Sequence, residues 1–255
     1  MELDKVAVAI RPRNHWEAID LGFKMTRELA KPVYVAWLSI FVPVVVLAHI
    51  VAWGSLGWAI LIVWWSKPLL DRVVLIVLSR AVFGATPTVG EALRELAGIR
   101  FGDLIHALTI ARLDPGRSFT MPVWLLEGLR GKARRQRINT LKRRTSSAPF
   151  WHTMSCWHLE SVLAFGMFLL AIWMVPEQYG IDWEALFTSE QLPEWLLAMR
   201  NGVYVLAVAA LEPFFVAGGF SLYLNRRTVL EGWDIELTFR RMAPRISTLK
   251  GAQPT

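Results

Sequence analysis

The sequence lacks the short motifs by which soluble enzymes hold nucleotides, metals or activated nucleophiles. It contains no GxxxxGK[ST] or GxGxxG phosphate-binding loop, no GxSxG nucleophile elbow and no HExxH zinc motif. Cys156 is the single cysteine, which excludes an intramolecular disulfide and a CxxC metal or redox site. We therefore expect no catalytic residue, no cofactor and no metal, in a protein that is not an enzyme.

Long stretches of the chain also lack charge. The sequence is 54% hydrophobic and contains 13 tryptophans, which is too apolar for an ordinary soluble domain. Residues 33–53 hold no formal charge, and at about 1.5 Å rise per residue a helix of this length crosses a hydrocarbon core of about 30 Å. No cleavable signal peptide precedes it, because residues 1–31 are charged and contain Pro12. The first span should insert as an uncleaved anchor.

Three further apolar runs follow the first. A two-residue turn separates it from residues 56–83, whose length of about 42 Å as a helix exceeds a bilayer, so its end should protrude into the cytoplasm. Residues 158–175 and 203–224 form the third and fourth runs. The pattern predicts four transmembrane helices. They are arranged as two hairpin domains, 33–83 and 157–224.

Lys and Arg are absent from some of the connecting segments. The segments 1–32, 84–156 and 225–255 hold 6, 12 and 6 of the 28 Lys and Arg residues. The turn 54–55 and the segment 176–199 hold none, and the latter has five acidic residues. Because Lys and Arg concentrate in cytoplasmic loops, we expect both termini and the segment 84–156 in the cytoplasm. The segment 176–199 should be an acidic periplasmic loop.

Residues 13–31 show helical spacing of apolar side chains. Trp16, Ile19, Phe23 and Ala30 fall on one face, flanked by basic residues. This pattern indicates an amphipathic helix that lies on the cytoplasmic leaflet. A helix packed against the protein's own cytoplasmic part is an equally good interpretation.

The segment 84–156 should be a helical cytoplasmic loop. Thr88 followed by Glu91 makes a capping box, so a helix should begin directly after Thr88. A second short helix is expected over 100–113, and a further surface helix at the start of the tail 225–255. The predicted fold class is an all-α polytopic membrane protein with four transmembrane helices, interfacial amphipathic helices and a helical cytoplasmic loop.

Charges inside the predicted spans are the most specific chemical feature. Counted from the periplasmic ends, Lys67 lies about 17 Å along the second run and Glu212 about 14 Å along the fourth, so both fall near mid-membrane. A lone charge there costs at least about 2.5–3.5 kcal/mol, and a cross-helix Lys67–Glu212 pair would relieve both. Asp71, four residues after Lys67, is an alternative partner. Asp71 and Arg72 lie nearer the cytoplasmic face, where they can pair or snorkel.

Two interpretations of these residues remain open. A mid-membrane polar site in helices broken by proline is typical of transporters, and its candidates are Lys67, Asp71, Arg72 and Glu212, beside Pro43, Pro68 and Pro213. The structural interpretation, which we favour, is that prolines are tolerated in membrane helices and that one buried ion pair specifies packing. His152, Cys156, His158 and Glu160 match no common metal-ligand spacing and are interpreted as polar residues at the boundary of the third span.

A basic run lies in the predicted cytoplasmic loop. It contains no acidic residue and eight cations: Arg130, Lys132, Arg134, Arg135, Arg137, Lys142, Arg143 and Arg144. Contact with anionic lipid headgroups, at about 1 kcal/mol per residue, is the first interpretation. An acidic cytoplasmic partner is the second. Nucleic acid is not expected, because no aromatic residues alternate with the arginines as base stacking would need.

Several long strings of the sequence resemble one family of bacterial membrane proteins. They are IRPRNHWEAIDLGFKMTREL, WWSKPLLDRVVLIVLSRAVFGATPTVGEALREL, ARLDPGRSF, MPVWLLEGLRGKARRQR and EPFFVAGGFSLYLNRRTVLEGWDIELTFRRM. They resemble the uncharacterised proteins encoded beside a MoxR-type AAA+ ATPase, in operons that also carry a von Willebrand-like protein, a stage II sporulation protein M-like membrane protein and an RDD-type membrane protein. Relatives often continue into a further C-terminal region, so whether the natural product extends beyond Thr255 stays open.

The resemblance implies context and brings no catalytic residues. It implies a location in the bacterial inner membrane and partners among the products of the same operon, the MoxR-type ATPase included. The function we expect is that of a non-enzymatic membrane component of a multi-protein assembly. The alternative is a transporter or lipid-handling protein that uses the mid-membrane polar residues.

Overall fold

The computed structural model describes residues 11–53, 55–84, 87–98, 101–143, 145, 147–175 and 193–232. All regular structure in these residues is helical. The long helices are α1 (His15–Glu28), α2 (Ala30–Val51), α3 (Leu56–Phe83), α9 (Ala148–Trp173) and α11 (Glu194–Glu231). The short helices are α4 (Val89–Ala97), α5 (Phe101–Leu108), α6 (Ile110–Leu113), α7 (Arg117–Leu125) and α8 (Gly131–Lys142).

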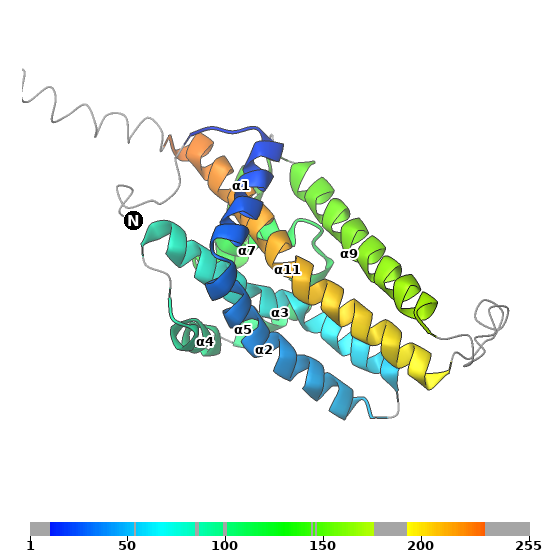
Figure 1. Cartoon of the computed structure of the whole chain (residues 1–255). Helices are drawn as coiled ribbons and strands as arrows, with labels where there is room; N and C mark the ends of the chain where they lie inside the picture. The colour runs from blue at the N-terminus through cyan, green and yellow to red at the C-terminus, as the bar shows by residue number, and fades with distance from the viewer. Residues whose placement is uncertain are drawn as a thin grey trace, which may run out of the picture.

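Helices α2, α3, α9 and α11 lie side by side as two antiparallel hairpins (Figure 1). The ends of α2 and α9 and the starts of α3 and α11 share one end of the molecule, and the short helices gather toward the other end. Helix α1 crosses α11 on the outside of this arrangement. The structure therefore contains the two predicted pairs of antiparallel helices, α2 with α3 and α9 with α11.

Helices α2, α9 and α11 are long and apolar enough to cross a membrane, which indicates a membrane protein. Helix α3 has the predicted bounds but is not among them, because Lys67, Asp71 and Arg72 interrupt its apolar run. The all-helical fold class and three of the four predicted spans are thus supported. Most of the predicted periplasmic loop 176–199 and of the tail 225–255 lies outside the described residues.

Two predicted span boundaries differ from the helix boundaries. Helix α9 begins at Ala148 rather than at residue 158, and α11 runs from Glu194 to Glu231 rather than over 203–224. The expected helix at the start of the tail is, up to Glu231, the last part of α11, which ends at Gly232 in the left-handed conformation (φ 64°). Hydropathy marks where charge begins, whereas a helix continues through charged residues that are good helix formers.

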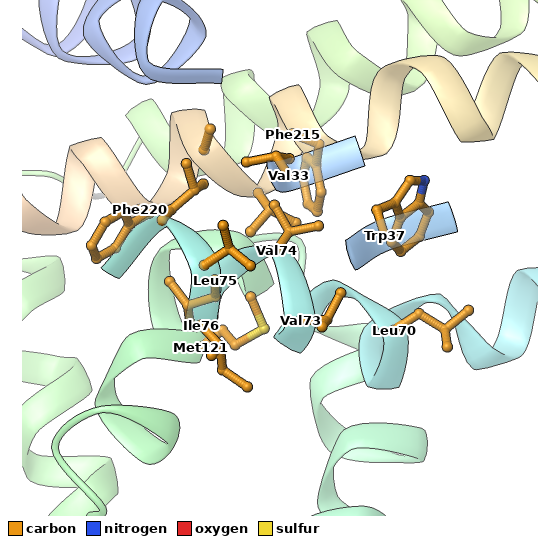
Figure 2. Packing of buried hydrophobic residues seen from close by; sticks show 14 of the residues in the cluster. Val33, Trp37, Leu70, Val73, Val74, Leu75, Ile76, Met121, Phe215 and Phe220 are labelled. Atoms are coloured by element: carbon orange, nitrogen blue, oxygen red, sulfur yellow. The ribbon is translucent and has the colours of Figure 1, made fainter. Parts of the chain in front are cut away.

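The second half of α3 forms the centre of the core (Figure 2). Its consecutive apolar residues from Val73 to Leu78 are all buried. They belong to one cluster with Val33 of α2, Met121 of α7 and Phe220 of α11, and Figure 2 shows Val33 and Met121 on opposite sides of them. A helix that is apolar on every side is stable only when other helices surround it, and here the short helices α4, α5 and α7 complete the enclosure.

Pro213 interrupts the hydrogen bonding of α11 at a place where α2 compensates. Proline has no N–H, so the carbonyl of Ala209, four residues earlier, loses its helical donor. The indole Nε1 of Trp37 on α2 donates to that oxygen at 3.2 Å, and the hydroxyl of Tyr34 donates to the carbonyl of Ala210 at 2.6 Å. These bonds fix the position of α2 against α11.

Small residues let α11 approach its neighbours closely. A Cβ atom on Gly218 would overlap the ring of His152 on α9, and one on Gly219 would overlap Ser118 on α7. On the α1 side, a Cβ on Gly22 would overlap the backbone of Ala217. Glycine at these positions is therefore required by packing rather than by backbone conformation.

Helix α1 packs against α11, at residues that belong to the predicted fourth span 203–224 rather than to the predicted cytoplasmic part of the protein. The hydroxyl of Ser221 on α11 donates to the carbonyl of Ala18 at 2.5 Å, and the buried face contains Ala18, Ile19, Gly22, Met25 and Thr26. The predicted apolar face is therefore partly wrong: Ile19 is buried, but Trp16 is 62% exposed. The capping box of Thr88 and Glu91 starts α4 at Val89, as predicted.

Candidate functional site

Lys67 lies between two carboxylates from the second hairpin. Its Nζ is 2.6 Å from Oε2 of Glu212 on α11 and 2.8 Å from Oε2 of Glu160 on α9. The predicted cross-helix pair of Lys67 and Glu212 is present, and the alternative pairing with Asp71 is not. Glu160, interpreted from the sequence as a boundary residue, is a second partner and buried.

Arg117 of α7 extends this arrangement into an ion-pair cluster. Its guanidinium is 2.6 Å from Oε1 of Glu212 and 3.2 Å from Oδ2 of Asp71. The charges alternate in the order Glu160, Lys67, Glu212, Arg117, Asp71, and we use "ion-pair cluster" for these five residues. The cluster joins four helices, because α3 contributes Lys67 and Asp71 while α7, α9 and α11 contribute one residue each.

The depth of the pair follows from the register of α3 and α11, which run parallel. The side-chain amide of Asn201 donates to the carbonyl of Leu56 at 2.8 Å, so these two residues are level. Lys67 follows Leu56 by 11 residues and Glu212 follows Asn201 by 11 residues. Eleven residues make about three turns or about 16 Å, which returns both side chains to the facing sides of the helices. The charges therefore meet even though α11 begins earlier than predicted.

Arg112 of α6 is a buried cation beside the cluster. It is 9% exposed, and its guanidinium lies over the ring of Trp64 at 3.4 Å from the ring centroid. Its Nε has no hydrogen-bond partner, and Arg112 forms no ion pair within the described part of the chain. Burial lowers the pKa of Arg112 to about 10, so the side chain stays charged at neutral pH.

Two cavities lie against the cluster and share three residues. The central cavity, of about 200 Å³, is lined by Arg112, Lys67 and Glu212 and opens past Leu113. The outer cavity, of about 360 Å³, lies toward the hairpin turn and is lined by Gly57 and by Tyr204, whose buried hydroxyl has no hydrogen-bond partner among the described residues. Both cavities are lined by Trp64, Trp157 and Glu160.

Arg72 is the sequence candidate that the structure separates from the others. It is fully buried, its guanidinium lies 4.2 Å from the ring centroid of Trp124, and its Nη2 donates to the carbonyl of Asp103 at 3.4 Å. It therefore points toward α5 and α7, away from Lys67. Of the two residues expected to pair or snorkel, Asp71 does pair, with Arg117, whereas Arg72 is enclosed by aromatic and backbone groups.

The basic run divides into cations with and without internal partners. Arg137 pairs with Glu127 at 2.8 Å and with Glu231, and Arg130 and Lys142 pair with Asp103 and Asp114 at 2.5 and 3.4 Å. Arg137 is therefore a member of the basic run whose charge is paired inside the protein. Lys132, Arg134, Arg135 and Arg143 make no ion pair with the described residues. Arg144 lies outside them.

Sequence reasoning missed Arg117 and Arg112. They flank the segment Leu113-Asp114-Pro115-Gly116, which reverses the chain between α6 and α7 and directs both side chains toward α3 and α11. No signal in the sequence indicated them, because the four mid-membrane candidates Lys67, Asp71, Arg72 and Glu212 balance in charge. The need for a further cation arises only in the structure, where Arg72 lies apart and Glu160 joins the cluster.

His152 has a packing role in the structure. Its ring stacks on Phe215 with centroids 5.6 Å apart, and its Nε2 is 2.9 Å from the carbonyl of Phe215. Cys156 approaches the same ring at 3.7 Å. No group of three His, Cys, Asp or Glu residues suited to a metal ion occurs among the residues searched, which are the described ones.

Comparisons of the chain with protein-family models, with curated proteins and with solved structures find no match. The description of the chain therefore depends on its fold and on the ion-pair cluster alone. Over its described residues the chain is all-helical, with three helices long and apolar enough to cross a membrane and a buried ion-pair cluster that joins its two hairpins.

Proposed function

We propose that the chain is a non-enzymatic, four-span component of a multi-protein assembly in the bacterial inner membrane, linked to a MoxR-type AAA+ ATPase. In this proposal α3 is the fourth span and both termini are cytoplasmic. The ion-pair cluster supports a membrane-embedded α3, because each of its charges has a partner on another helix. Paired charges are what allow a helix such as α3 to be accommodated in a bilayer.

A groove beside α8 is the observation that carries the assembly role. It has a volume of about 710 Å³ and lies between α8 and the helices α5 to α7. Ile110, Trp124 and Ile138 supply apolar lining, and the cations Lys132, Arg134 and Arg135 lie along one side. A groove with apolar lining and unpaired cations fits an acidic segment of a partner protein, with charge complementarity favouring its approach.

Co-purification in mild detergent tests the assembly role. We expect the combined change Lys132→Gln, Arg134→Gln and Arg135→Gln to release partners in a salt-dependent way, because exposed charges act through screened interactions. The matched control removes three exposed cations of α1 and α2 that do not line the groove: Lys24→Gln, Arg27→Gln and Lys31→Gln. The proposal would be overturned if the groove variant kept the same partners as the unmodified protein and if no MoxR-type ATPase co-purified with either of them.

Topology reporters test the orientation separately. A reporter fused after Tyr179 should be active only in its periplasmic form, and one fused after Arg137 only in its cytoplasmic form, since Lys and Arg avoid the first region and concentrate in the second. The reverse pattern at either site would contradict the four-span topology.

The two cavities favour a second candidate function. Buried charges that line adjoining cavities between membrane helices are also the arrangement of a transport or lipid-handling protein. Uptake of solute or movement of lipid in proteoliposomes of this protein alone would favour this candidate over the assembly role.

A further inference from the structure

We propose that the central cavity binds the headgroup of a zwitterionic phospholipid, with the phosphate on Arg112 and a primary ammonium on Glu160. This site goes beyond the assembly role, and of the proposed function it needs only the membrane location. It names one class of ligand for a cavity that the ion-pair cluster leaves open.

Arg112 supplies the anion-binding half of the site. It is more than nine-tenths buried, lines the cavity and makes no ion pair with any residue that the structure describes. Stacking on Trp64 holds the guanidinium plane in place, and an ordered guanidinium presents paired N–H groups that match two phosphate oxygens. A buried arginine without a carboxylate partner is costly unless an anion joins it.

Glu160 supplies the cation-binding half. Its Oε2 accepts from Lys67, while its Oε1 makes no hydrogen bond with the described residues, and the residue lines both cavities. The neighbouring ring of Trp157 adds an aromatic face, which attracts an ammonium group. A primary ammonium can donate a hydrogen bond to the free oxygen, whereas a quaternary ammonium cannot.

The charge balance of the site selects a ligand without net charge. The residues that line the cavity carry three positive charges, on Lys67, Arg112 and Arg117, and three negative charges, on Asp114, Glu160 and Glu212. Asp71 and Lys142, which pair with members of this set, add one charge of each sign. A ligand with a net charge would add an uncompensated charge in a region of low dielectric constant. A zwitterion adds one charge of each sign and places each beside an opposite charge of the protein.

The position of the cavity along α9 suits a lipid headgroup. Counting back from Trp173, a hydrocarbon core of about 30 Å ends about 20 residues earlier, near Thr153. The cavity is lined by α9 residues from Thr153 to Glu160, so it begins at the membrane surface and reaches about 10 Å inward. Leu113 and Trp157 at its rim are 77% and 56% exposed, and the acyl chains can continue along the apolar surface of α9.

Native mass spectrometry of the delipidated full chain in detergent tests the proposal. The probe is an equimolar mixture of phosphatidylethanolamine, phosphatidylcholine and phosphatidylglycerol with identical acyl chains. We expect phosphatidylethanolamine to be retained best, and Arg112→Gln to weaken its retention about tenfold through loss of charge-assisted hydrogen bonds. Arg94→Gln, the same change at an exposed position of α4 that lines neither cavity, should have no effect. Glu160→Gln should reduce the preference for phosphatidylethanolamine over phosphatidylcholine.

Three results would overturn the proposal. These are equal retention of the three lipids, equal behaviour of the Arg112 and Arg94 variants, or displacement of the lipid by soluble phosphoethanolamine at millimolar concentration, which would assign the cavity to a free solute. Glu160→Gln also breaks an ion pair, so Arg112→Gln, whose side chain has no ion pair to lose, decides the result if the former does not fold. Failure of the assembly role would appear separately, in the co-purification of the wild-type protein.

Discussion

In each of the two hairpins, α2–α3 and α9–α11, the first helix lies at the periphery and the second lies at the centre. The most apolar stretch of α2 is 28% buried and that of α9 only 6%, whereas that of α11 is 67% buried. The second half of α3 is enclosed on all sides. Both central helices carry a charge directly followed by proline, Lys67-Pro68 and Glu212-Pro213, at the same level of the molecule.

The peripheral helices are attached to this centre by different forces. Helix α2 donates hydrogen bonds from Trp37 and Tyr34 to carbonyl oxygens of α11 and adds apolar packing. Helix α9 is held through the Glu160 ion pair and the contacts of His152 with α11. The comparison teaches that both peripheral helices contact α11, and that attachment of α9, through its ion pair with Lys67 on α3, depends more on charge than attachment of α2.

Removal of Glu212 should have the largest effect on stability. Glu212→Gln leaves Lys67 and Arg117 each with one carboxylate in a buried site, and breaking such a pair costs about 3–5 kcal/mol. Glu160→Gln should cost less, because Lys67 keeps Glu212, and it should loosen α9 more than α2. Denaturant unfolding in detergent measures the first effect, and alkylation of Cys156 on α9 reports the second.

Because Lys67 has two carboxylate partners in the ion-pair cluster, a second substitution should restore only part of the stability that Glu212→Gln loses. The combination Lys67→Met and Glu212→Gln leaves Glu160 without its cation, so it should recover only part of the loss; adding Glu160→Gln should recover more. Losses that simply add in these variants would mean that the three charges are not energetically coupled.

Disruption of the close packing of α11 should cause the next largest loss of stability. Gly219→Ala places a methyl group against the backbone of Ser118 on α7, and overpacking of this kind costs about 1–3 kcal/mol. Gly166→Ala on α9 is the matched control, because no atom lies within 4 Å of the added group, and the helix propensity of alanine should make it neutral or stabilising. Equal unfolding midpoints of the two variants would contradict the close approach of α7 and α11.

The helices and the Lys67–Glu212 pair could be predicted from local signals. A capping box, long apolar runs and two charges at equal depth depend only on neighbouring residues and on helix rise, and each led to a feature that the structure contains. The starts of α9 and α11 could not be predicted in this way. The apolar runs end near His158 and Arg200, whereas the helical hydrogen bonding continues past these residues.

The remaining members of the cluster depend on tertiary structure. Arg117 and Arg112 lie outside the apolar runs, and only the reversal of the chain between α6 and α7 brings them to Lys67 and Glu212. Arg137 presents the same problem in another form. Its partner Glu231 is far away in sequence, so a run of cations could not reveal which of its members are paired internally.

Loss of the hydrogen bond from Trp37 to α11 should lower the stability by a smaller amount. The size of this loss should depend on Pro213. Trp37→Phe keeps the packing but leaves the carbonyl of Ala209 without a donor, at a cost of about 1 kcal/mol. Pro213→Ala restores an N–H four residues after that carbonyl, so the same tryptophan substitution should cost less in its presence. Unfolding midpoints of the four proteins in this cycle give the coupling. An equal cost of Trp37→Phe in both backgrounds would show that the indole does not serve the carbonyl that proline frees.

The smallest effect should lie outside both hairpins, at the start of α4. The backbone N–H of Thr88 donates to Oε2 of Glu91 at 2.9 Å, and this bond lowers the pKa of the Glu91 carboxyl. The carboxylate therefore stabilises the helix start above its unfolded pKa of about 4.3, and this contribution is lost as the pH falls through the lowered folded value. Protection factors for amide hydrogen exchange in the first turn of α4 should fall between pH 6 and pH 3, while those of α11 change less. Glu91→Gln keeps an acceptor for the Thr88 N–H but cannot titrate, so its α4 protection should be independent of pH, and a decline equal to that of the unmodified protein would assign the pH dependence to another group.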